Sequence, residues 1–308
     1  LATGATEYHP KEFLYEENEK VVTQVELAER LKEKGAQNLN QVVMIQCIGS
    51  RNQDNPNCSR ICCQSAIKNA LNIKKLNPDA EIYILYRDIR TYGILEDYYT
   101  EARKQGVLFF RYDPEDPPTV ESSDEGVMVT FIDPLLGRRL RVSADLLALS
   151  AGMVAEDTEE LSSIVKLART AEGHFMEAHV KLRPVDMATE GVFVCGTAHS
   201  PKLLHESISQ AFAAASRATT FLSQPHLTLS AVTAQVEADL CASCLICVRS
   251  CPYQVPRINE DGVSEIDMAL CHGCGVCAAE CPAKAIELNW YEDVQIMSKV
   301  DALLEGVM

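Results

Sequence analysis

The first half of the chain alternates between continuous apolar runs and longer stretches of helical character. Apolar runs of strand length occur at residues 41–47, 81–86, 107–111 and 146–149. Unbroken runs of this kind are typical of strands that are buried on both faces of a parallel sheet. Helices are predicted before and between them, at residues 24–34, 58–76 and 95–105. This alternation of strand and helix predicts an α/β domain of the doubly wound type.

Local signals define the ends of some of these elements. Thr23-Gln-Val-Glu26 is a capping box that opens the first helix, and Gly35 ends that helix. The run Pro134-Leu-Leu-Gly137 separates two strand-like stretches, at residues 127–133 and 138–142. We therefore expect a hairpin at this point of the chain.

The second half follows another pattern. An apolar strand at residues 191–196 is predicted to lead into a long helix at residues 204–222, and residues 223–235 form a linker. Near the end, residues 285–288 have the composition of a strand, and residues 294–304 have the spacing of an amphipathic helix. This final helix is expected to dock on the preceding domain or on a partner.

Residues 1–5, Leu-Ala-Thr-Gly-Ala, resemble the end of a buried strand and the turn after it. A globular domain does not normally begin in the middle of its sheet, because a core strand would then lack its neighbours. We therefore expect these 308 residues to be the C-terminal part of something longer, or to pair with a separate N-terminal polypeptide.

Composition narrows the class of function. A chain of 308 residues has material for two domains, and its net charge of −16 argues against nucleic acid or an anionic membrane surface as a partner. Acidic surfaces suit docking with redox partners. No apolar stretch approaches about 18 residues and the first residues lack an export signal, so we expect no membrane span. Twelve of the thirteen cysteines have metal-cluster spacing, which favours a reducing cytoplasm, and Cys195 is predicted to be core.

Two cysteine runs near the C-terminus carry the most specific signal. Residues 241–252 read CASCLICVRSCP and residues 271–282 read CHGCGVCAAECP. This tandem CxxCxxCxxxCP pattern resembles a bacterial-type ferredoxin module with two 4Fe-4S clusters. The resemblance assigns one cluster to Cys241, Cys244, Cys247 and Cys281, and the other to Cys271, Cys274, Cys277 and Cys251. Gly273 and Gly275 suit a tight second loop. Zinc knuckles or a disulfide scaffold are the alternatives, but zinc does not need the third and fourth cysteine of each run.

A third group of cysteines follows the strand predicted at residues 41–47. In a nucleotide-binding βαβ unit the next turn would read GxGxxG and would place a pyrophosphate on the helix N-terminus. The turn here lacks those glycines and contains Cys47, Cys58, Cys62 and Cys63 instead. Thiolates that converge on a helix N-terminus, whose dipole favours negative charge, predict a third 4Fe-4S site. Buried structural cysteines and a zinc site are the alternatives.

Short turns in the chain resemble those of the thioredoxin reductase-like flavoproteins, which contain two dinucleotide-binding domains. Thr3-Gly4 resembles the turn that leads from the FAD domain into the second domain, and Ser150-Ala-Gly152 resembles the return. Gly196-Thr197 stands where that family has Gly-Asp. The resemblance implies that Thr3, Gly4, Gly196 and Thr197 contact FAD.

The helix predicted at residues 204–222 would then direct its N-terminus toward the pyrimidine edge of the flavin. A helix N-terminus supplies positive potential, which stabilises an anionic reduced flavin. Arg183 and Lys202 flank this segment and are candidate flavin contacts. Ordinary surface charges are the alternative for both side chains.

Taken in order, these features resemble the A-type subunit of the heterodisulfide reductases and its relatives. In that family a thioredoxin reductase-like FAD domain with an inserted cluster site joins ferredoxin modules, and the flavin can bifurcate electron pairs between a high-potential and a low-potential acceptor. The resemblance implies an oxidoreductase subunit with FAD and three 4Fe-4S clusters. It also implies partners: subunits like heterodisulfide reductase B and C, an iron–sulfur subunit linked to hydrogenase or formate dehydrogenase, and ferredoxin.

The same resemblance predicts the division into domains. The FAD domain remainder would occupy residues 1–40 and 143–230, with an inserted dinucleotide-type α/β domain at residues 41–142. An α+β ferredoxin domain would occupy residues 231–290, and a C-terminal helix residues 291–308.

Two other functions compete with an electron-transferring, bifurcating subunit. The first is a flavin-free iron–sulfur conduit, because the GxGxxG of an FAD domain does not occur in these 308 residues and Gly196-Thr197 departs from Gly-Asp. The second is an NAD(P)H-dependent flavoprotein like the small subunit of glutamate synthase. That protein needs GxGxxG where Cys47 to Cys63 stand here.

Overall fold

The computed structural model describes residues 1–123, 126–226 and 232–305. The chain forms two compact units. The first contains Leu1–Asp157, Thr170–His174 and Cys195–Ala211, and the second contains Thr158–Arg169, Phe175–Val194 and Phe212–Met308. The domain boundary predicted near residue 230, and part of the predicted linker, lie outside the described residues.

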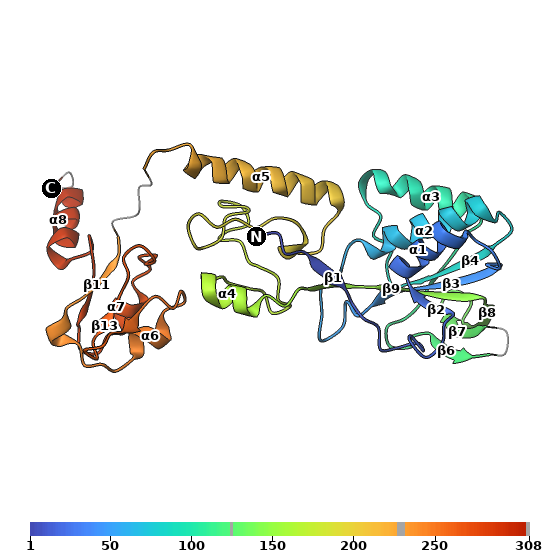
Figure 1. The fold of residues 1–308 in the computed structure, drawn as a ribbon, viewed down its shortest axis with the longest axis horizontal. Coiled ribbons are helices and arrows are strands. Elements are labelled where there is room, and N and C mark those ends of the chain that lie inside the picture. The colour runs from blue at the N-terminus through green and yellow to red at the C-terminus, as the bar shows by residue number, and fades with distance from the viewer. Residues whose placement is uncertain (124–125, 227–231, 306–308) are drawn as a thin grey trace. The chain divides into compact units, whose positions relative to one another are not determined.

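A five-stranded parallel sheet forms the centre of the first unit, with strand order β2-β9-β3-β4-β5. Its strands are β2 (Val21–Thr23), β3 (Gln41–Ile48), β4 (Glu81–Tyr86), β5 (Leu108–Arg111) and β9 (Leu146–Ala151). Three helices cover one face: α1 (Gln24–Lys34), α2 (Cys62–Leu76) and α3 (Glu96–Lys104), which follows the short turn η1 (Gly93–Leu95) (Figure 1). This arrangement confirms the predicted α/β fold.

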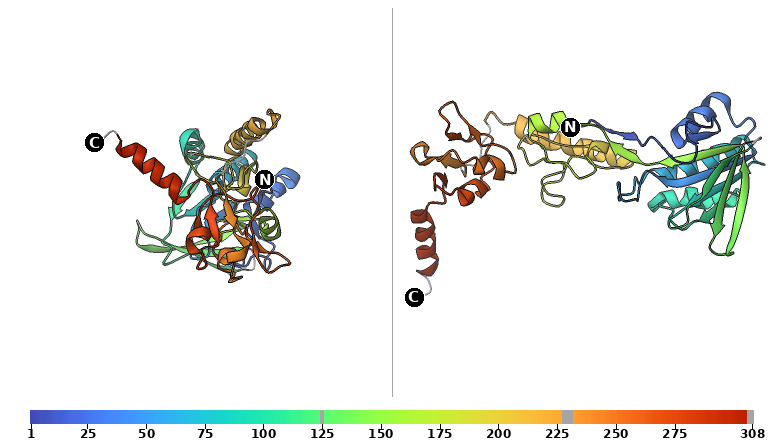
Figure 2. Two further views of the ribbon diagram at one scale, coloured as in Figure 1. Left: turned by 90° about the vertical axis from the view of Figure 1, so that its left-hand side faces the viewer. Right: turned by 90° about the horizontal axis from the view of Figure 1, so that it is seen from below.

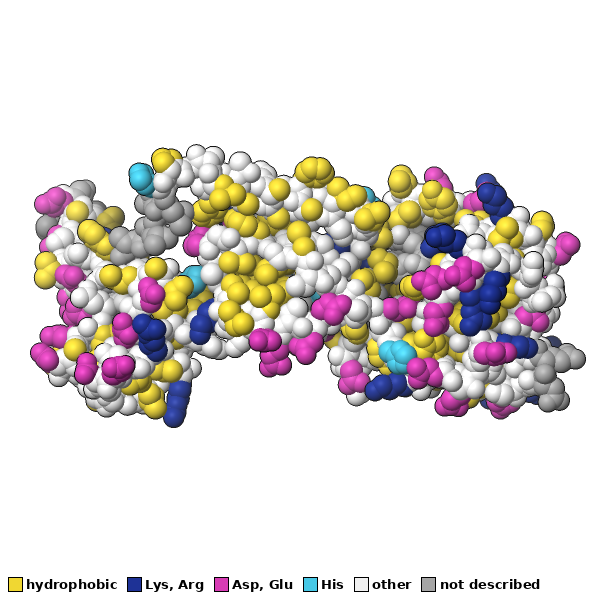
Figure 3. All heavy atoms as spheres, in the orientation of Figure 1, with side chains coloured by type: hydrophobic (Ala, Val, Ile, Leu, Met, Phe, Trp, Pro, Cys, Tyr) yellow, Lys and Arg dark blue, Asp and Glu magenta, His cyan; other side chains and the backbone are white. Residues whose placement is uncertain are grey.

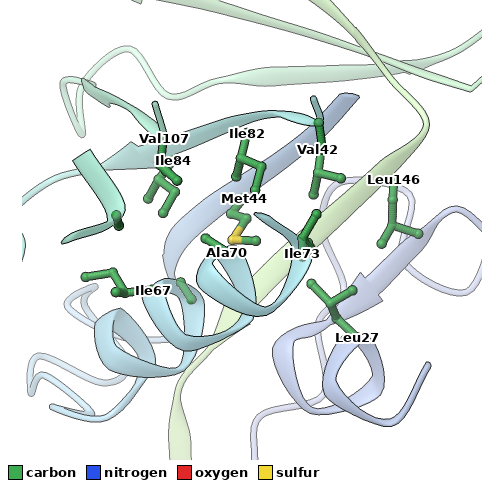
Figure 4. Packing of buried hydrophobic residues seen from close by; sticks show 14 of the residues in the cluster. Leu27, Val42, Met44, Ile67, Ala70, Ile73, Ile82, Ile84, Val107 and Leu146 are labelled. Carbon is green, nitrogen blue, oxygen red and sulfur yellow. The ribbon is translucent and has the colours of Figure 1, made fainter. Parts of the chain in front are cut away.

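Side chains of β3 alternate between the two faces of the sheet, as the pleat of a strand requires. Val42 and Met44 pack toward the helices, where they meet Ile67 and Ile73 of α2 and Leu27 of α1 (Figure 4). All five are buried. The continuous apolar run predicted for a central parallel strand therefore reflects burial on both sides of the sheet.

A three-stranded antiparallel sheet covers the other face. It consists of β6 (Thr119–Ser122), β7 (Val127–Asp133) and β8 (Arg138–Ala144). Val43 and Ile45 of β3 pack on this side, in one cluster with Val129 and Phe131 of β7. The β7–β8 pair is the hairpin predicted around Pro134-Leu-Leu-Gly137.

The remaining strands of the first unit are short. The strand β1 (Ala5–Glu7) pairs with β10 (Met153–Ala155) in antiparallel orientation. The strand predicted at residues 191–196 is wrong: within the described residues this segment forms only a single bridge, between Phe193 and Asp186. It leads into the turn η2 (Gly196–Ala198) and then into α5 (Leu204–Leu222), which has the predicted bounds.

The second unit contains a small α+β module. Its strand β11 (Ala234–Val236) pairs with β14 (Ile286–Leu288), and β12 (Arg257–Ile258) pairs with β13 (Ser264–Glu265). Between these strands lie three helical segments, η3 (Ala238–Leu240), α6 (Ile246–Ser250) and α7 (Val276–Glu280). The last helix, α8 (Asp293–Leu304), extends from the module toward the C-terminus (Figure 2). This unit also contains α4 (Glu159–Val165).

Helices α5 and α8 bury no residue and expose apolar side chains. Helix α5 has no buried residue, and Leu204, Ile208 and Phe212 are exposed along it (Figure 3). Helix α8 also has no buried residue. Val294 and Leu303, which belong to its predicted apolar face, are exposed. In the parts of the chain that the structure describes, no helix is both long enough and apolar enough to cross a membrane.

Candidate iron–sulfur and flavin sites

The first of the two predicted ferredoxin ligand sets lies around one small pocket. That pocket is lined by Cys241, Cys244, Cys247 and Cys281 together with apolar neighbours. Backbone amides point at two of these sulfurs: the Ser264 N–H donates to Cys241 Sγ at 3.5 Å, and the Ala285 N–H donates to Cys281 Sγ at 3.3 Å. Amide donors of this kind stabilise negative charge on cluster thiolates. The fold thus brings the predicted set together.

The second set of four also converges. Burial and the neighbouring thiols of Cys271, Cys251 and Cys274 raise the pKa of Cys277 to about 11. The Ala234 N–H donates to Cys271 Sγ at 3.3 Å. Removing the protons of these neighbouring thiols would place several negative charges close together. A bound metal group compensates such charges, so deprotonation of the site is coupled to metal binding.

The two cysteine loops have the same backbone form. Helix α6 is preceded by Leu245 at φ 63°, and α7 is preceded by Gly275 at φ 75°. Gly273 has a second reason to be glycine, because a Cβ there would lie 2.3 Å from the Val232 carbonyl oxygen. The tight second loop expected from the sequence is therefore present.

The cysteines also form much of the interior of this module. Its six buried core residues are Ala234, Cys247, Cys277, Cys281, Ala285 and Ile286. Half of them are cysteines from the two predicted sets. Thiols in the core of a module are well placed to hold clusters. The same module has few other buried apolar side chains to stabilise its fold.

The third group lies at the carboxyl end of the parallel sheet. Cys47 is near the end of β3, Cys62 and Cys63 are the first two residues of α2, and Cys58 lies in the loop before that helix. The pKa of Cys62 is raised well above its ordinary value, first by a hydrogen bond with Cys63, then by burial and by the charges of Cys63, Cys47 and Cys58. The other three thiols thus lie within electrostatic reach of Cys62.

The donor set of this third group suits a cluster. Cys62 and Cys63 are buried, and Cys47 and Cys58 are partly buried. The Arg60 N–H donates to Cys58 Sγ at 3.3 Å. All thirteen cysteines of the chain are free thiols. Within the described residues, no three His, Cys, Asp or Glu side chains are arranged to hold a single metal ion.

Beside this group lies a large pocket with predominantly apolar walls and a volume of about 750 Å³. One side is formed by Ile61, Ile67 and Leu71, and the other by Thr197 and Lys202 with the residues that follow them. Cofactor pockets typically have this size and an apolar lining. Among the described residues of this lining, Gln64 Nε2 and Thr91 Oγ1 are buried atoms without a hydrogen-bond partner. Orphaned polar atoms of this kind indicate a missing polar ligand.

The four residues that the resemblance assigns to FAD contacts, Thr3, Gly4, Gly196 and Thr197, lie close together. A Cβ on Gly4 would lie 4.0 Å from Thr197 Oγ1, so the Thr3-Gly4 turn is next to Gly196-Thr197. Lys202 is buried, and its ammonium donates to the carbonyl oxygens of Gly196 (2.8 Å) and Ser200 (3.0 Å). Lys202 therefore fixes the turn after Gly196, while the pocket lies against the same residue.

The N-terminus of α5 is less positive than the sequence suggested. Glu206, in its first turn, accepts a hydrogen bond from the Leu203 N–H at 2.7 Å and forms an ion pair with Arg60 at 2.5 Å. This carboxylate offsets part of the helix dipole. Arg183, also predicted near the flavin, belongs to the second unit, where it forms ion pairs with Asp186 at 3.6 Å and Glu190 at 3.1 Å.

Cys195 is half-buried, and its Sγ lies 3.7 Å from the Leu1 carbonyl oxygen. It is therefore less enclosed than the core position that we predicted.

Known proteins resemble both parts of the chain. Residues 240–286 match the family model described as a 4Fe-4S dicluster domain. The chain is 37% identical to the A 1 iron-sulfur subunit of CoB–CoM heterodisulfide reductase from Methanopyrus kandleri, over 99% of this chain and 49% of that protein. It is 38% identical to the A subunit of H2/formate:CoB-CoM heterodisulfide,ferredoxin reductase from Methanococcus maripaludis, over 99% of this chain and 50% of that protein.

Among solved structures, thioredoxin reductase of T. acidophilum is similar with a TM-score of 0.48 and 14% identity, over 72% of this chain and 65% of that chain. The chain spans about half the length of the curated relatives it matches. The identity to those relatives extends over nearly all of this chain, which is therefore similar to about half of a heterodisulfide reductase A-type subunit.

Proposed function

We propose that this chain is an electron-transferring flavo-iron–sulfur subunit of an oxidoreductase complex. The observation that carries the proposal is the group of four thiols at the start of α2, where a dinucleotide-binding fold would bind a pyrophosphate. These four thiols, which lie beside a cofactor-sized pocket, would hold a cluster, and that cluster would supply electron transfer where the dinucleotide-binding fold binds a nucleotide.

The proposed relay contains two kinds of carrier. Bound FAD would supply the chemistry of a carrier that accepts two electrons and releases them singly. Three 4Fe-4S clusters would accept one electron at a time. We assign them to these ligand sets: Cys47, Cys58, Cys62 and Cys63; Cys241, Cys244, Cys247 and Cys281; Cys251, Cys271, Cys274 and Cys277.

The residues of this chain would position the flavin in three ways. The Lys202 ammonium donates to the carbonyl oxygens of Gly196 and Ser200 and so fixes the turn between these two residues. The aliphatic walls of the 750 Å³ pocket would exclude water from a planar ring. Thr91 Oγ1 and Gln64 Nε2 would find hydrogen-bond partners on its polar edge. Residues 1–308 contain no GxGxxG turn, so these three features would contact the flavin without a glycine-rich loop for its pyrophosphate.

We further propose that the flavin bifurcates electron pairs and that the complex works in a reducing cytoplasm. The name of the Methanococcus maripaludis relative contains both a heterodisulfide and ferredoxin. By analogy, partners of this chain would be subunits of the heterodisulfide reductase B and C type, a hydrogenase- or formate dehydrogenase-linked iron–sulfur subunit, and ferredoxin. Thirteen free thiols are in keeping with a reducing compartment.

A flavin-free conduit is the second candidate, and one observation favours it: Glu206 offsets the positive end of α5 that would face the flavin. Measuring flavin content separates the two candidates. The same residues 240–286 would carry electrons in either case.

NADH is expected not to reduce the flavin of this protein. The turn that would bind NADH contains Cys47 to Cys63 in place of GxGxxG, so no glycine-rich loop is available for the pyrophosphate. Stopped-flow absorbance at the flavin band, with dithionite as the positive control, measures this. Fast stoichiometric bleaching by NADH would overturn the proposal in favour of a pyridine nucleotide-dependent flavoprotein.

A further inference from the structure

Three arginines, at positions 51, 87 and 90, lie in the loops that follow β3 and β4, on the side of the sheet where α2 begins. Arg51 Nη1 lies 3.9 Å from Cys47 Sγ, at the limit of a hydrogen bond to sulfur. Cys63 Sγ lies 3.7 Å from the Asp88 carbonyl oxygen, so the loop that contains residues 87–90 lies beside the cysteines.

One carboxylate and one backbone carbonyl oxygen hold these guanidinium groups in place. Asp88 forms ion pairs with Arg51 at 2.7 Å and with Arg90 at 3.8 Å. Arg87 Nη1 donates to the Arg51 carbonyl oxygen at 2.9 Å. Three positive charges against one negative charge leave an excess of positive charge at this edge of the sheet. The Arg51 side chain is 20% exposed, so water screens its charge only in part.

The ferredoxin module has the opposite charge balance. Residues 231–290 contain eight Asp and Glu and three Lys and Arg. Its cluster sulfurs accept hydrogen bonds from backbone amides, those of Ala234, Ser264 and Ala285. Backbone amides carry a partial charge, whereas a guanidinium carries a full one.

Reduction adds an electron to a group that already carries the negative charge of its thiolates. Net charge and hydrogen bonds to sulfur are among the main determinants of cluster potential. Full positive charges close to the sulfurs stabilise the reduced form more than the oxidised form, and an acidic surrounding does the reverse.

From this asymmetry we infer that the cluster of Cys47, Cys58, Cys62 and Cys63 is the high-potential one-electron site of the chain, and that Arg51 is the positioning residue that sets its potential. This inference rests on the proposed function, since it requires that cluster to be present. It gives the relay a direction: the site at the start of α2 accepts electrons more readily than either ferredoxin cluster.

The test is a redox titration of the anaerobically purified chain, followed by electron paramagnetic resonance. The signal that disappears in Cys62→Ser identifies the cluster concerned. In Arg51→Met we expect the midpoint potential of that signal to fall, by the 59 mV that corresponds to a tenfold change for one electron or by more. Arg51→Lys keeps the charge without the planar fork and is expected to shift it less.

Matched variants keep the test decisive. Arg139→Met removes an exposed arginine of β8 and is expected to leave all potentials unchanged. If Arg51→Met fails to retain its iron, Arg90→Met removes a neighbouring charge without the contact to Cys47, and a fall in potential is again expected.

The inference is overturned if Arg51→Met keeps its full iron content and its midpoint potential is unchanged. If Arg51→Met loses iron, an unchanged midpoint potential in Arg90→Met overturns it instead. A wild-type signal below both ferredoxin signals would also overturn it. Those results leave the proposed three clusters intact. In contrast, about eight iron atoms in the wild type and no signal sensitive to Cys62→Ser would show that the third cluster itself is absent.

Discussion

Replacing Cys62 with serine is expected to remove about four iron atoms per chain and leave about eight. Cys62 is buried at the start of α2, and the charges of three other thiols act on it, so it is the central member of the third group. Serine has nearly the same volume but is a poor ligand for a cluster. The two ferredoxin sets lie in the other compact unit and should keep their iron.

Iron and sulfide analysis, with electron paramagnetic resonance of the reduced protein, measures this effect. Cys195→Ser is the matched control, because Cys195 is half-buried and belongs to none of the three sets. Equal iron contents in Cys62→Ser and in the wild type would show that the third group is structural rather than a cluster site.

Removing iron from the protein is expected to unfold residues 232–290 while the parallel sheet stays folded. Among the described residues, the hydrophobic core of this module has six buried members, and three of them are the ligand candidates Cys247, Cys277 and Cys281. The buried non-thiol members are Ala234, Ala285 and Ile286, and the other apolar side chains packed against them, such as Val236 and Leu288, are only partly buried. So small an interior cannot offset the entropy of ordering the chain, and the free energy of metal binding becomes folding free energy.

Hydrogen exchange with mass spectrometry, before and after anaerobic chelation, reads this out by segment. The internal control is β4, whose Ile84 and Leu85 are fully buried in a core of ordinary apolar side chains. Amides of the module that exchange as slowly without iron as with it would contradict the expectation.

The regular part of the fold was predictable from sequence because its signals are local. The capping box at Thr23 and Glu26 is present, with the Glu26 N–H donating to Thr23 Oγ1. The apolar runs became β3, β4, β5 and β9 because unbroken apolar sequence fits a strand that is covered on both sides.

The predictions of secondary structure that failed concern segments whose structure depends on long-range contacts. Residues 191–196 have strand composition, yet they find no neighbouring strand within the described residues and form only the bridge between Phe193 and Asp186. Residues 119–122 lie in a stretch rich in Pro, Asp, Glu and Ser whose composition predicts a solvated loop, yet they pair with β7 as β6. Pairing partners, rather than intrinsic preference, determined both outcomes.

For the sites, spacing identifies the cysteines but not their surroundings. Both ferredoxin sets converge as expected, because the repeated CxxCxxCxxxCP pattern constrains the backbone. The arginines at positions 51, 87 and 90 have no spacing signal of their own, since they come from two different loops that only the parallel sheet brings together. Their position after adjacent strands of a parallel sheet is the one feature of the sequence that could have identified them.

The measurement that tests the central claim most directly is the iron, sulfide and flavin content of the anaerobically purified chain, with and without the polypeptide encoded beside it. Three clusters and a working flavin site predict about twelve iron atoms and one FAD per chain. About eight iron atoms and no flavin under either condition would contradict the account, and would leave a two-cluster electron conduit.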